Sequence, residues 1–263
     1  MKTITGVIIT LNEAEHIADC IKSLMPVCNE IIIVDSGSRD QTREIAQNLG
    51  AKVHIQKFLG DGPQKNHGLA LAENEWILSL DADERLHDTA VKTINALDLK
   101  NTSYEAFALR RRNHIGSRWI KVCGWHPDYC IRLYHKGKTR FSETNIHDKV
   151  TTKNYKKLDA DIVHYSFHNI GELFGKHSDR SFSTWGAKIL YRKDYKANSF
   201  SPFFHGTWAL FNSYFLKRGF LGGCDGLTVA ISSAVNSYLK YAKLLEYQRD
   251  QSVQEKEDFE HFF

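Results

Sequence analysis

The sequence has few of the features that mark secreted, membrane-spanning or thiolate-metal proteins. Its five cysteines are odd in number, and no two of them have Cys-x-x-Cys spacing, which argues against a thiolate zinc or redox motif. No apolar run reaches the roughly 20 residues that a membrane-spanning helix needs. The chain passes from Met1 straight into a β-rich run, so we expect no signal peptide. We therefore expect a cytoplasmic protein with reduced thiols.

Acidic residues are scarce in the middle of the chain. Between positions 110 and 142 the only acid is Asp128. The basic residues in that window are Arg110, Arg111, Arg112, Arg118, Lys121, Arg132, Lys136, Lys138 and Arg140. This local excess predicts an anionic partner that carries phosphate or carboxylate groups, with a solvated strand face as the plainer alternative. The net charge of +4 is modest and no binding motif accompanies it, so nucleic acid is not expected as a partner.

The chain is globular in composition, with 42% hydrophobic and 25% charged residues over 263 positions. Its first third alternates strand and helix patterns. The predicted strands cover 4–11, 30–35, 52–56 and 76–81, and the predicted helices cover 15–24, 40–49 and 64–72. This alternation predicts an α/β fold in which a mostly parallel sheet carries helices on both faces.

The remaining two thirds have a different pattern. Predicted strands cover 105–112, 129–134 and 138–141, with a hairpin turn at 135–137 and another strand pair within 149–163. From Gly171 onward the pattern is helical. We therefore expect a domain at 1–168, whose two halves (1–98 and 99–168) differ in pattern, followed by a helical region at 169–263.

The segment from Trp76 to Glu84 carries the clearest chemical signal. A short apolar run, typical of a buried strand, ends in Asp81 and Asp83. Open α/β sheets bind ligands at the carboxyl ends of their strands. Two carboxylates there can hold Mg²⁺ or Mn²⁺ against substrate phosphates, which points to a nucleotide diphosphate. The plainer alternative is a solvated turn after the strand.

Four motifs follow one another in the first third of the chain. They are TLNE at 10–13, VDSGSRDQT at 34–42, KNHGLA at 65–70 and SLDADE at 79–84. In this order and at this spacing, the region closely resembles the inverting family 2 glycosyltransferases, which have the GT-A fold. The resemblance implies a nucleotide-sugar donor site. It also implies that 1–168 is a catalytic domain, with a nucleotide-binding half at 1–98 and an acceptor half at 99–168.

The resemblance assigns a role to each motif. Leu11, Asn12 and Glu13 would form the wall of the nucleotide pocket. Asp35 would accept hydrogen bonds from the uracil or the ribose, where the plainer alternative is a residue that caps the next helix.

Lys65 would contact the diphosphate as a point charge, unless it is a solvated helix residue. Asp83, with Asp81 close by, would hold Mg²⁺ or Mn²⁺ against the diphosphate.

An inverting transfer also needs a base that removes the proton of the acceptor hydroxyl. The candidate carboxylates are Asp128, Glu143 and Asp148, of which we favour Asp148 and Asp128 without separating them. His147, beside Asp148, is a further candidate metal ligand. For each carboxylate the alternative is a hairpin or surface acid.

A finer resemblance covers nearly the whole chain. The segments 125–134, 140–142, 146–150 and 217–223 look like those of bacterial lipopolysaccharide inner-core β-1,4-glucosyltransferases. This implies transfer of glucose from UDP-glucose to a heptose of the lipopolysaccharide core. The chain departs from the pattern at His126 and at 223–225, which leaves the acceptor open.

Two alternatives remain. One is transfer to a protein, a peptide or another cell-envelope glycan. The other is a nucleotide-sugar-binding protein without catalysis, against which the intact Asp81 and Asp83 argue.

Aromatic residues crowd into a short stretch of the last third. They are Phe200, Phe203, Phe204, Trp208, Phe211, Tyr214, Phe215 and Phe220, and Lys217 and Arg218 lie among the last of them. Such a segment can lie in the headgroup plane of a membrane, which predicts peripheral attachment to the inner face of the cytoplasmic membrane. The alternative is an ordinary helical region that packs its rings on the catalytic domain.

Overall fold

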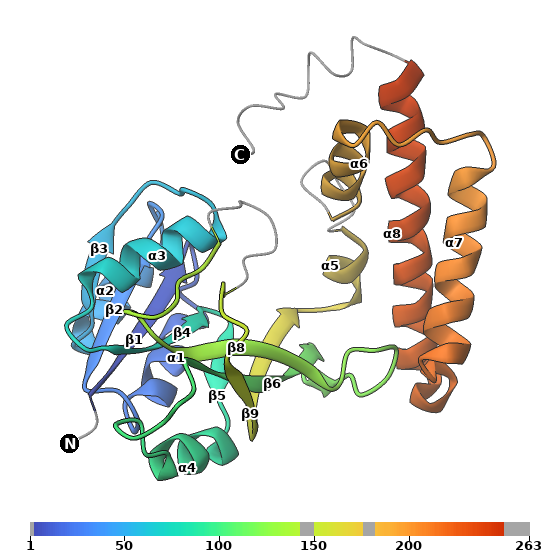
Figure 1. Ribbon diagram of the computed structural model, residues 1–263. Coiled ribbons are helices and arrows are strands. Elements are labelled where there is room, and N and C mark those ends of the chain that lie inside the picture. The colour runs from blue at the N-terminus through green and yellow to red at the C-terminus, as the bar shows by residue number, and fades with distance from the viewer. Residues whose placement is uncertain (1–2, 143–149, 176–181, 250–263) are drawn as a thin grey trace. The chain divides into compact units, whose positions relative to one another are not determined.

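The computed structural model describes residues 3–142, 150–175 and 182–249. Its contacts divide the chain into two compact units (Figure 1). The first, which we call the sheet unit, consists of residues 1–112 and 128–164. The second, the helical unit, consists of residues 113–127 together with those from 165 onward. The domain limits predicted from the sequence stay a prediction.

Four parallel strands form the first half of the sheet. They are β1 (Ile4–Thr10), β2 (Glu30–Asp35), β3 (Lys52–Ile55) and β4 (Trp76–Asp81), in the order β3-β2-β1-β4. The helices that connect them are α1 (Ile17–Leu24), α2 (Thr42–Asn48) and α3 (Asp61–Leu71). α3 begins at Asp61, three residues before the predicted start at Gln64, and so takes in the predicted turn.

Beyond β4 the sheet becomes antiparallel. The path continues through β8 (Asp128–His135), β6 (Ala106–Ile115), β9 (Tyr155–Phe167) and β5 (Glu84–Leu86). A short β7 (Arg118–Trp119) pairs with β6, and α4 (Asp88–Ala96) follows β5. The sheet is therefore mixed, and its α/β class agrees with the GT-A fold expected from the resemblance.

Two predicted strand segments differ from the structure. The segment 138–141 forms only an isolated bridge between Phe141 and Val150. The strand pair expected within 149–163 is a single strand, β9, which runs from Tyr155 to Phe167.

Helices cover both faces of the sheet (Figure 1). One apolar cluster joins alternate strand residues such as Ile4 and Ile8 to residues of α1, α2 and α4. A second cluster on the other face joins Val7, Ile32 and Val34 to the α3 side. β1 thus contributes to both cores because successive side chains of a strand point to opposite faces.

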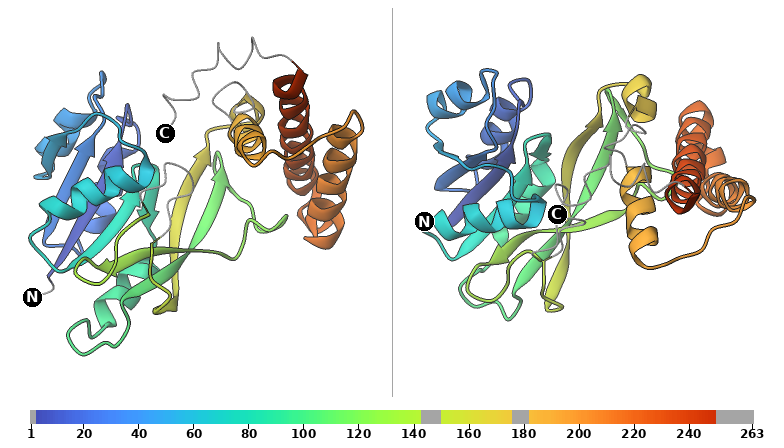
Figure 2. Two further views of the ribbon diagram at one scale, coloured as in Figure 1. Left: turned by 45° about the horizontal axis from the view of Figure 1, so that its top comes forward. Right: turned by 90° about the horizontal axis from the view of Figure 1, so that it is seen from above.

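The helical unit confirms the predicted C-terminal helical region. It contains α5 (Ile170–Gly175), α6 (Phe182–Arg192), α7 (Ser201–Phe211), the π-helical turn η1 (Asn212–Leu216), the 3₁₀ turn η2 (Gly219–Gly222) and α8 (Gly223–Arg249). α7 and α8 lie side by side (Figure 2). Within the described residues, no helix has both the length and the apolar character to cross a bilayer.

Candidate active site

Three strands of the sheet unit end at one edge. β1 lies between β2 and β4, and all three run parallel (Figure 1). The register pairs Thr10 with Asp35 and Ile9 with Asp81. Since adjacent strands are about 4.8 Å apart, the backbones of the two aspartates are about 10 Å apart across β1. The sheet therefore presents both predicted acids at the edge where α/β sheets bind ligands.

Asp35 is fully buried and holds its own turn. Its Oδ1 accepts hydrogen bonds from the backbone N–H groups of Gly37 (3.0 Å) and Ser38 (2.9 Å), and its Oδ2 accepts one from the Ser38 hydroxyl. The resemblance assigned Asp35 to the uracil or ribose. In this structure the carboxylate shapes the loop that follows β2.

The loops after β1 and β2 are tied to each other. The N–H of Asn12 donates to Ser38 Oγ (2.8 Å), and Asn12 Oδ1 accepts from the N–H of Arg39 (2.8 Å). The N–H of Glu13 donates to Thr42 Oγ1 (2.8 Å), and the Leu11 side chain is half exposed. The structure thus brings the predicted wall residues together with the Asp35 turn.

Lys65 reaches Asp81 because α3 packs unusually close to the sheet. A Cβ atom on Gly68 would lie 2.4 Å from Cγ1 of Val7, so only glycine permits this approach. Residues three apart share a helix face, which directs Lys65 to the same side. Its Nζ lies 2.9 Å from Asp81 Oδ1, and its side chain is almost fully buried.

The other oxygen of Asp81 is held by Arg132 from β8. Nη2 of this buried arginine lies 2.7 Å from Asp81 Oδ2 and 2.5 Å from Oε1 of the buried Glu84. Burial acts to raise the pKa of Asp81, but the charges of Arg132 and Lys65 outweigh it and lower the pKa below its usual range. Asp81 is therefore ionised across the physiological range.

The ion pairs continue to Asp128. Arg111 donates from Nε to Asp128 Oδ2 (2.9 Å), and its Nη1 lies 3.9 Å from Glu84 Oε1. Positive and negative groups thus alternate from Lys65 through Asp81, Arg132, Glu84 and Arg111 to Asp128. Asp128, a predicted base, is one end of this chain of charges.

Asp83 has a different partner. Its Oδ2 lies 3.3 Å from Nε2 of His164, which stands opposite Glu84 in the β5–β9 register. Burial lowers the pKa of His164, but the hydrogen bond with Asp83 and the charge of Glu84 outweigh it, so the pKa is raised.

These groups fit a divalent cation. At metal–ligand distances of about 2.1 Å, neighbouring ligand atoms of an octahedral ion are about 3 Å apart. The Oδ2–Nε2 separation of Asp83 and His164 is close to this spacing. Both oxygens of Asp81 already face cations, so Asp83 and His164 are the pair that would hold such an ion, which would displace the proton that they share.

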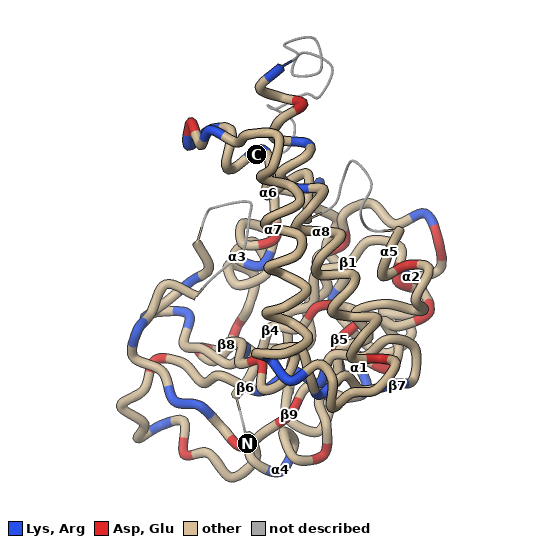
Figure 3. The backbone as a smooth tube through the Cα atoms, turned by 90° about the vertical axis from the view of Figure 1, so that its right-hand side faces the viewer, with Lys and Arg blue, Asp and Glu red and all other residues tan. Residues whose placement is uncertain are grey.

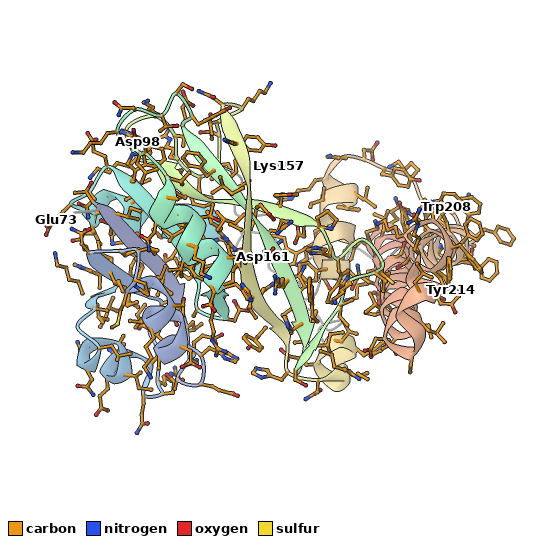
Figure 4. The ribbon with its side chains drawn as sticks, turned by 90° about the horizontal axis from the view of Figure 1, so that it is seen from below. Glu73, Asp98, Lys157, Asp161, Trp208 and Tyr214 are labelled. Atoms are coloured by element: carbon orange, nitrogen blue, oxygen red, sulfur yellow. The ribbon has the colours of Figure 1, made fainter. Side chains whose placement is uncertain are left out.

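The basic stretch is largely neutralised in the structure. Arg110 and Arg112 both bind the buried Asp161, which is labelled in Figure 4, and Arg118 pairs with Asp225. Arg111 and Arg132 are paired as described above. These arginines therefore form ion pairs within the protein, and they do not form the solvated basic face considered from the sequence.

Three predicted residues, Glu143, His147 and Asp148, lie outside the described residues. Three others that the structure brings to the site were missed from the sequence: Glu84, Arg132 and His164. Glu84 ends the SLDADE motif and Arg132 belongs to the basic stretch, so both had a signal. His164 had none, because it reaches the site only through the pairing of β9 with β5.

Comparison with known sequences decides the family. The profile of Glycosyl transferase family 2 matches residues 5–153, which hold all the described residues of this site except His164. The chain belongs to glycosyl transferase family 2.

Relatives of this family 2 enzyme extend over nearly the whole chain. An uncharacterized glycosyltransferase of Rickettsia felis is 32% identical over 94% of this chain and 90% of its own length. The lipopolysaccharide core biosynthesis glycosyltransferase LpsC of Rhizobium meliloti is 24% identical over 94% of this chain and 92% of its own.

Among solved structures, glucosyl-3-phosphoglycerate synthase of Mycobacterium tuberculosis, in complex with Mn²⁺ and UDP-Glc, is 25% identical over 43% of this chain and 44% of that one, with a TM-score of 0.37. The family model and the relatives establish that the protein is a glycosyltransferase. Its reaction therefore needs a nucleotide-sugar donor and an acceptor.

Proposed function

We propose that the protein transfers a hexose, glucose from UDP-glucose, to a heptose of a lipopolysaccharide core with inversion at the anomeric carbon. The observation that carries the proposal is the set of alternating charges at the end of β4, where Lys65, Asp81 and Arg132 lie beside the Asp83–His164 pair. This set suits a metal-bound diphosphate. The resemblance to inner-core glucosyltransferases supports glucose, and the relative LpsC supports a core acceptor.

The contacts support a specific role for each residue at the donor end of the site. Asp83 and His164, with Asp81 beside them, would hold Mg²⁺ or Mn²⁺, whose charge stabilises the departing diphosphate. Lys65 is positioned to move from Asp81 to a phosphate oxygen, since its ammonium is a flexible point charge. Arg132 keeps Asp81 ionised and in place. The tied loops at Asn12 and Ser38 form the nucleotide wall.

The base is a carboxylate that accepts the proton of the acceptor hydroxyl as its oxygen attacks. Of the three candidates, Asp128 is already held in an ion pair with Arg111, which would have to open before Asp128 could accept a proton from an acceptor. This favours Asp148, with Glu143 as the other candidate. Transfer rates of Asp148→Asn, Glu143→Gln and Asp128→Asn, each with donor binding intact, would separate the three.

Thermal denaturation with UDP, UDP-glucose, UDP-galactose and UDP-N-acetylglucosamine tests the donor site. Because a ligand that binds only the native state raises the melting temperature, UDP-glucose with Mn²⁺ should give the largest increase. The increase should vanish in Asp83→Ala and persist in Asp88→Ala, which removes an exposed acid of α4. No increase with any UDP compound would overturn the proposal.

Transfer to a heptose-terminated core lipid, compared with a peptide, tests the acceptor. Incorporation of labelled glucose into the lipid alone supports the proposal. Incorporation into the peptide alone would replace the lipid acceptor by a protein.

A further inference from the structure

The helical unit exposes an apolar stripe on α7 where a surface helix normally carries polar residues. The exposed side chains are Phe200, Phe203, Phe204, Trp208 and Phe211, whose exposed fractions range from 45 to 79%. At 3.6 residues per turn they fall within an arc of about 140°. Pro202 and Gly206, on the opposite side of the helix, are buried. The apolar face of α7 therefore points to solvent.

The stripe continues past the end of α7. Phe215 and Leu216 of η1 and Phe220 and Leu221 of η2 are all exposed by about half or more. Figure 4 shows the labelled Trp208 and Tyr214 among other ring side chains of this unit. The apolar surface thus extends from Phe200 to Leu221 without a charged side chain before Lys217.

An apolar groove opens between α7 and α8 beside this stripe. It has a volume of about 260 Å³, and its lining includes Phe203 and Leu210 of α7 with Val235 and Tyr238 of α8. Gly206 lets the helices approach, because a Cβ there would lie 3.2 Å from Cβ of Tyr238. Phe203 belongs to both the stripe and the groove, so the two are one continuous surface.

A basic hollow adjoins the other end of the stripe. It has a volume of about 420 Å³, and its lining includes Lys121, His126, Lys217 and Arg218. Leu216 and Leu221, exposed members of the stripe, also line it. The hollow and the apolar surface are therefore contiguous.

Two glycines allow η2 to pack closely on the loop that lines the hollow. A Cβ on Gly219 would lie 2.8 Å from Sγ of Cys123, and one on Gly222 would lie 2.5 Å from Cγ2 of Val122. Only a chain without side chains at these positions can pack so closely on the loop at 121–126. This packing brings Lys121 and His126 to the same hollow as Lys217 and Arg218.

The segment that forms this surface carries no acid in its own sequence. The sequence from Lys196 to Cys224 contains no aspartate or glutamate, and α7 carries no charged residue of either sign (Figure 3). Asp225, which follows directly, is paired with Arg118 at 3.1 Å. A face of exposed rings with a basic hollow at its end and no acid in its own segment matches the chemistry of a membrane interface, where acyl chains meet anionic headgroups.

We propose that the α7–η1–η2 face docks on an anionic phospholipid bilayer, with the stripe inserted among the acyl chains and a lipid phosphate in the basic hollow. The rings enter the headgroup boundary, and the cations stay at the level of the phosphates. This surface lies wholly in the helical unit, so the proposal does not depend on the donor or acceptor named above. It places the enzyme at the surface where a lipid-linked acceptor would be found.

Flotation of the full-length protein with phosphatidylcholine vesicles, with and without phosphatidylglycerol, tests the proposal in the absence of donor and metal. The wild type should bind the vesicles that contain phosphatidylglycerol, and added salt should weaken the binding. Phe204→Ser/Trp208→Ser should lower the partition coefficient at least about tenfold, because two inserted rings are lost. Lys217→Glu/Arg218→Glu should remove the preference for phosphatidylglycerol.

Matched control variants show whether vesicle binding depends on the stripe and the basic hollow or is non-specific. Phe182→Ser changes another exposed phenylalanine of the helical unit, and Lys92→Glu/Lys100→Glu reverses two exposed charges of the sheet unit. Both should bind like the wild type. All variants alter exposed side chains, so their melting temperatures should also match that of the wild type.

Fluorescence of Trp208 measures whether the stripe inserts into the bilayer. Trp208 is the one tryptophan with an exposed side chain in the described part of the chain, so lipids with brominated acyl chains should quench the wild type and quench Trp208→Phe much less. Lack of binding to anionic vesicles, or equal quenching of both proteins, would overturn the proposal. A dimer that Phe204→Ser/Trp208→Ser dissociates, without vesicle binding, would assign the face to a second copy of the chain.

Discussion

The guanidinium of Arg132 donates to Asp81 across 2.7 Å at a position that is almost closed to solvent. The same nitrogen lies 2.5 Å from Glu84. One buried cation therefore compensates two carboxylates at the end of β4. A buried ion pair is costly to break from one side, because the remaining charge keeps no partner of its own.

Replacement of Arg132 should therefore weaken the fold as well as the site. We expect Arg132→Met to lower the free energy of unfolding by up to about 3–5 kcal/mol, since it removes the closest cation of the buried Glu84 and one of the two cations that face Asp81. Urea denaturation measures this value. Glu84→Gln in the same chain should restore part of the loss, while Lys138→Met, at an exposed position, should change stability by less than about 0.5 kcal/mol. A small loss in Arg132→Met would mean that water already screens these charges.

The two aspartates of the Asp-Ala-Asp motif should differ in their effect on metal binding. Both oxygens of Asp81 already face cations, whereas Asp83 contacts the imidazole of His164. We expect Asp83→Asn to lower the affinity for Mn²⁺ in the presence of UDP by at least about tenfold, and Asp81→Asn to lower it less. Electron paramagnetic resonance of free Mn²⁺ measures both. An equal loss of Mn²⁺ affinity in the two variants would show that Asp81 binds the metal as directly as Asp83 does.

Gly68 should be intolerant of even one added carbon. Its missing Cβ would overlap Val7 and press on Val34 at 3.0 Å, so α3 would have to move away from the sheet. We expect Gly68→Ala to cost about 1–3 kcal/mol of stability and to weaken UDP binding by displacing Lys65. Gly175→Ala, where an added Cβ meets nothing within 4 Å, is the matched helical control. Unchanged UDP binding in Gly68→Ala would separate the packing of α3 from the site.

Asp161 should make stability depend on pH at the acid end. Burial raises its pKa, but the hydrogen bonds from Arg110 and Arg112 outweigh this and lower the pKa below the usual range. A lowered pKa contributes stability that is fully present above the unfolded value of about 3.9 and is lost as pH falls through the folded value. The stability difference between wild type and Asp161→Asn should therefore be largest near neutral pH and shrink below about pH 4. A difference that stays constant from pH 7 to pH 3 would contradict this origin.

The part of the site that lies on parallel strands was predictable from the sequence. Asp35 and Asp81 end apolar runs, and parallel strands bring such ends to one edge of the sheet. Lys65 lies one helical turn before Gly68, on the helix that leads into β4. These residues depend on local patterns and on one topological rule, so a single sequence is enough to place them together.

The part that lies on antiparallel strands was not predictable. Arg132 and His164 come from β8 and β9, whose register against β4 and β5 depends on pairing across long stretches of chain. The sequence also showed a run of bases with almost no acid, and suggested a solvated or ligand-binding surface. Apart from Asp128, the acids that pair with these bases, Glu84, Asp161 and Asp225, lie outside that run, so the sequence alone does not show the neutralisation.

Residues 113–127 belong to the helical unit, although the segments before and after them belong to the sheet unit. This arrangement limits how chimeras of this enzyme and its relatives can be built. The chain passes between the two units three times, after residues 112, 127 and 164. Gly219 and Gly222 fit against Cys123 and Val122, so the early loop and the late glycines must come from the same parent. A chimera with one crossover near residue 165 would combine the loop of one parent with the glycines of the other. A chimera that also exchanges 113–127 would keep the loop and the glycines from the same parent. The helical unit is in this sense a two-part module, and its parts should be inherited together.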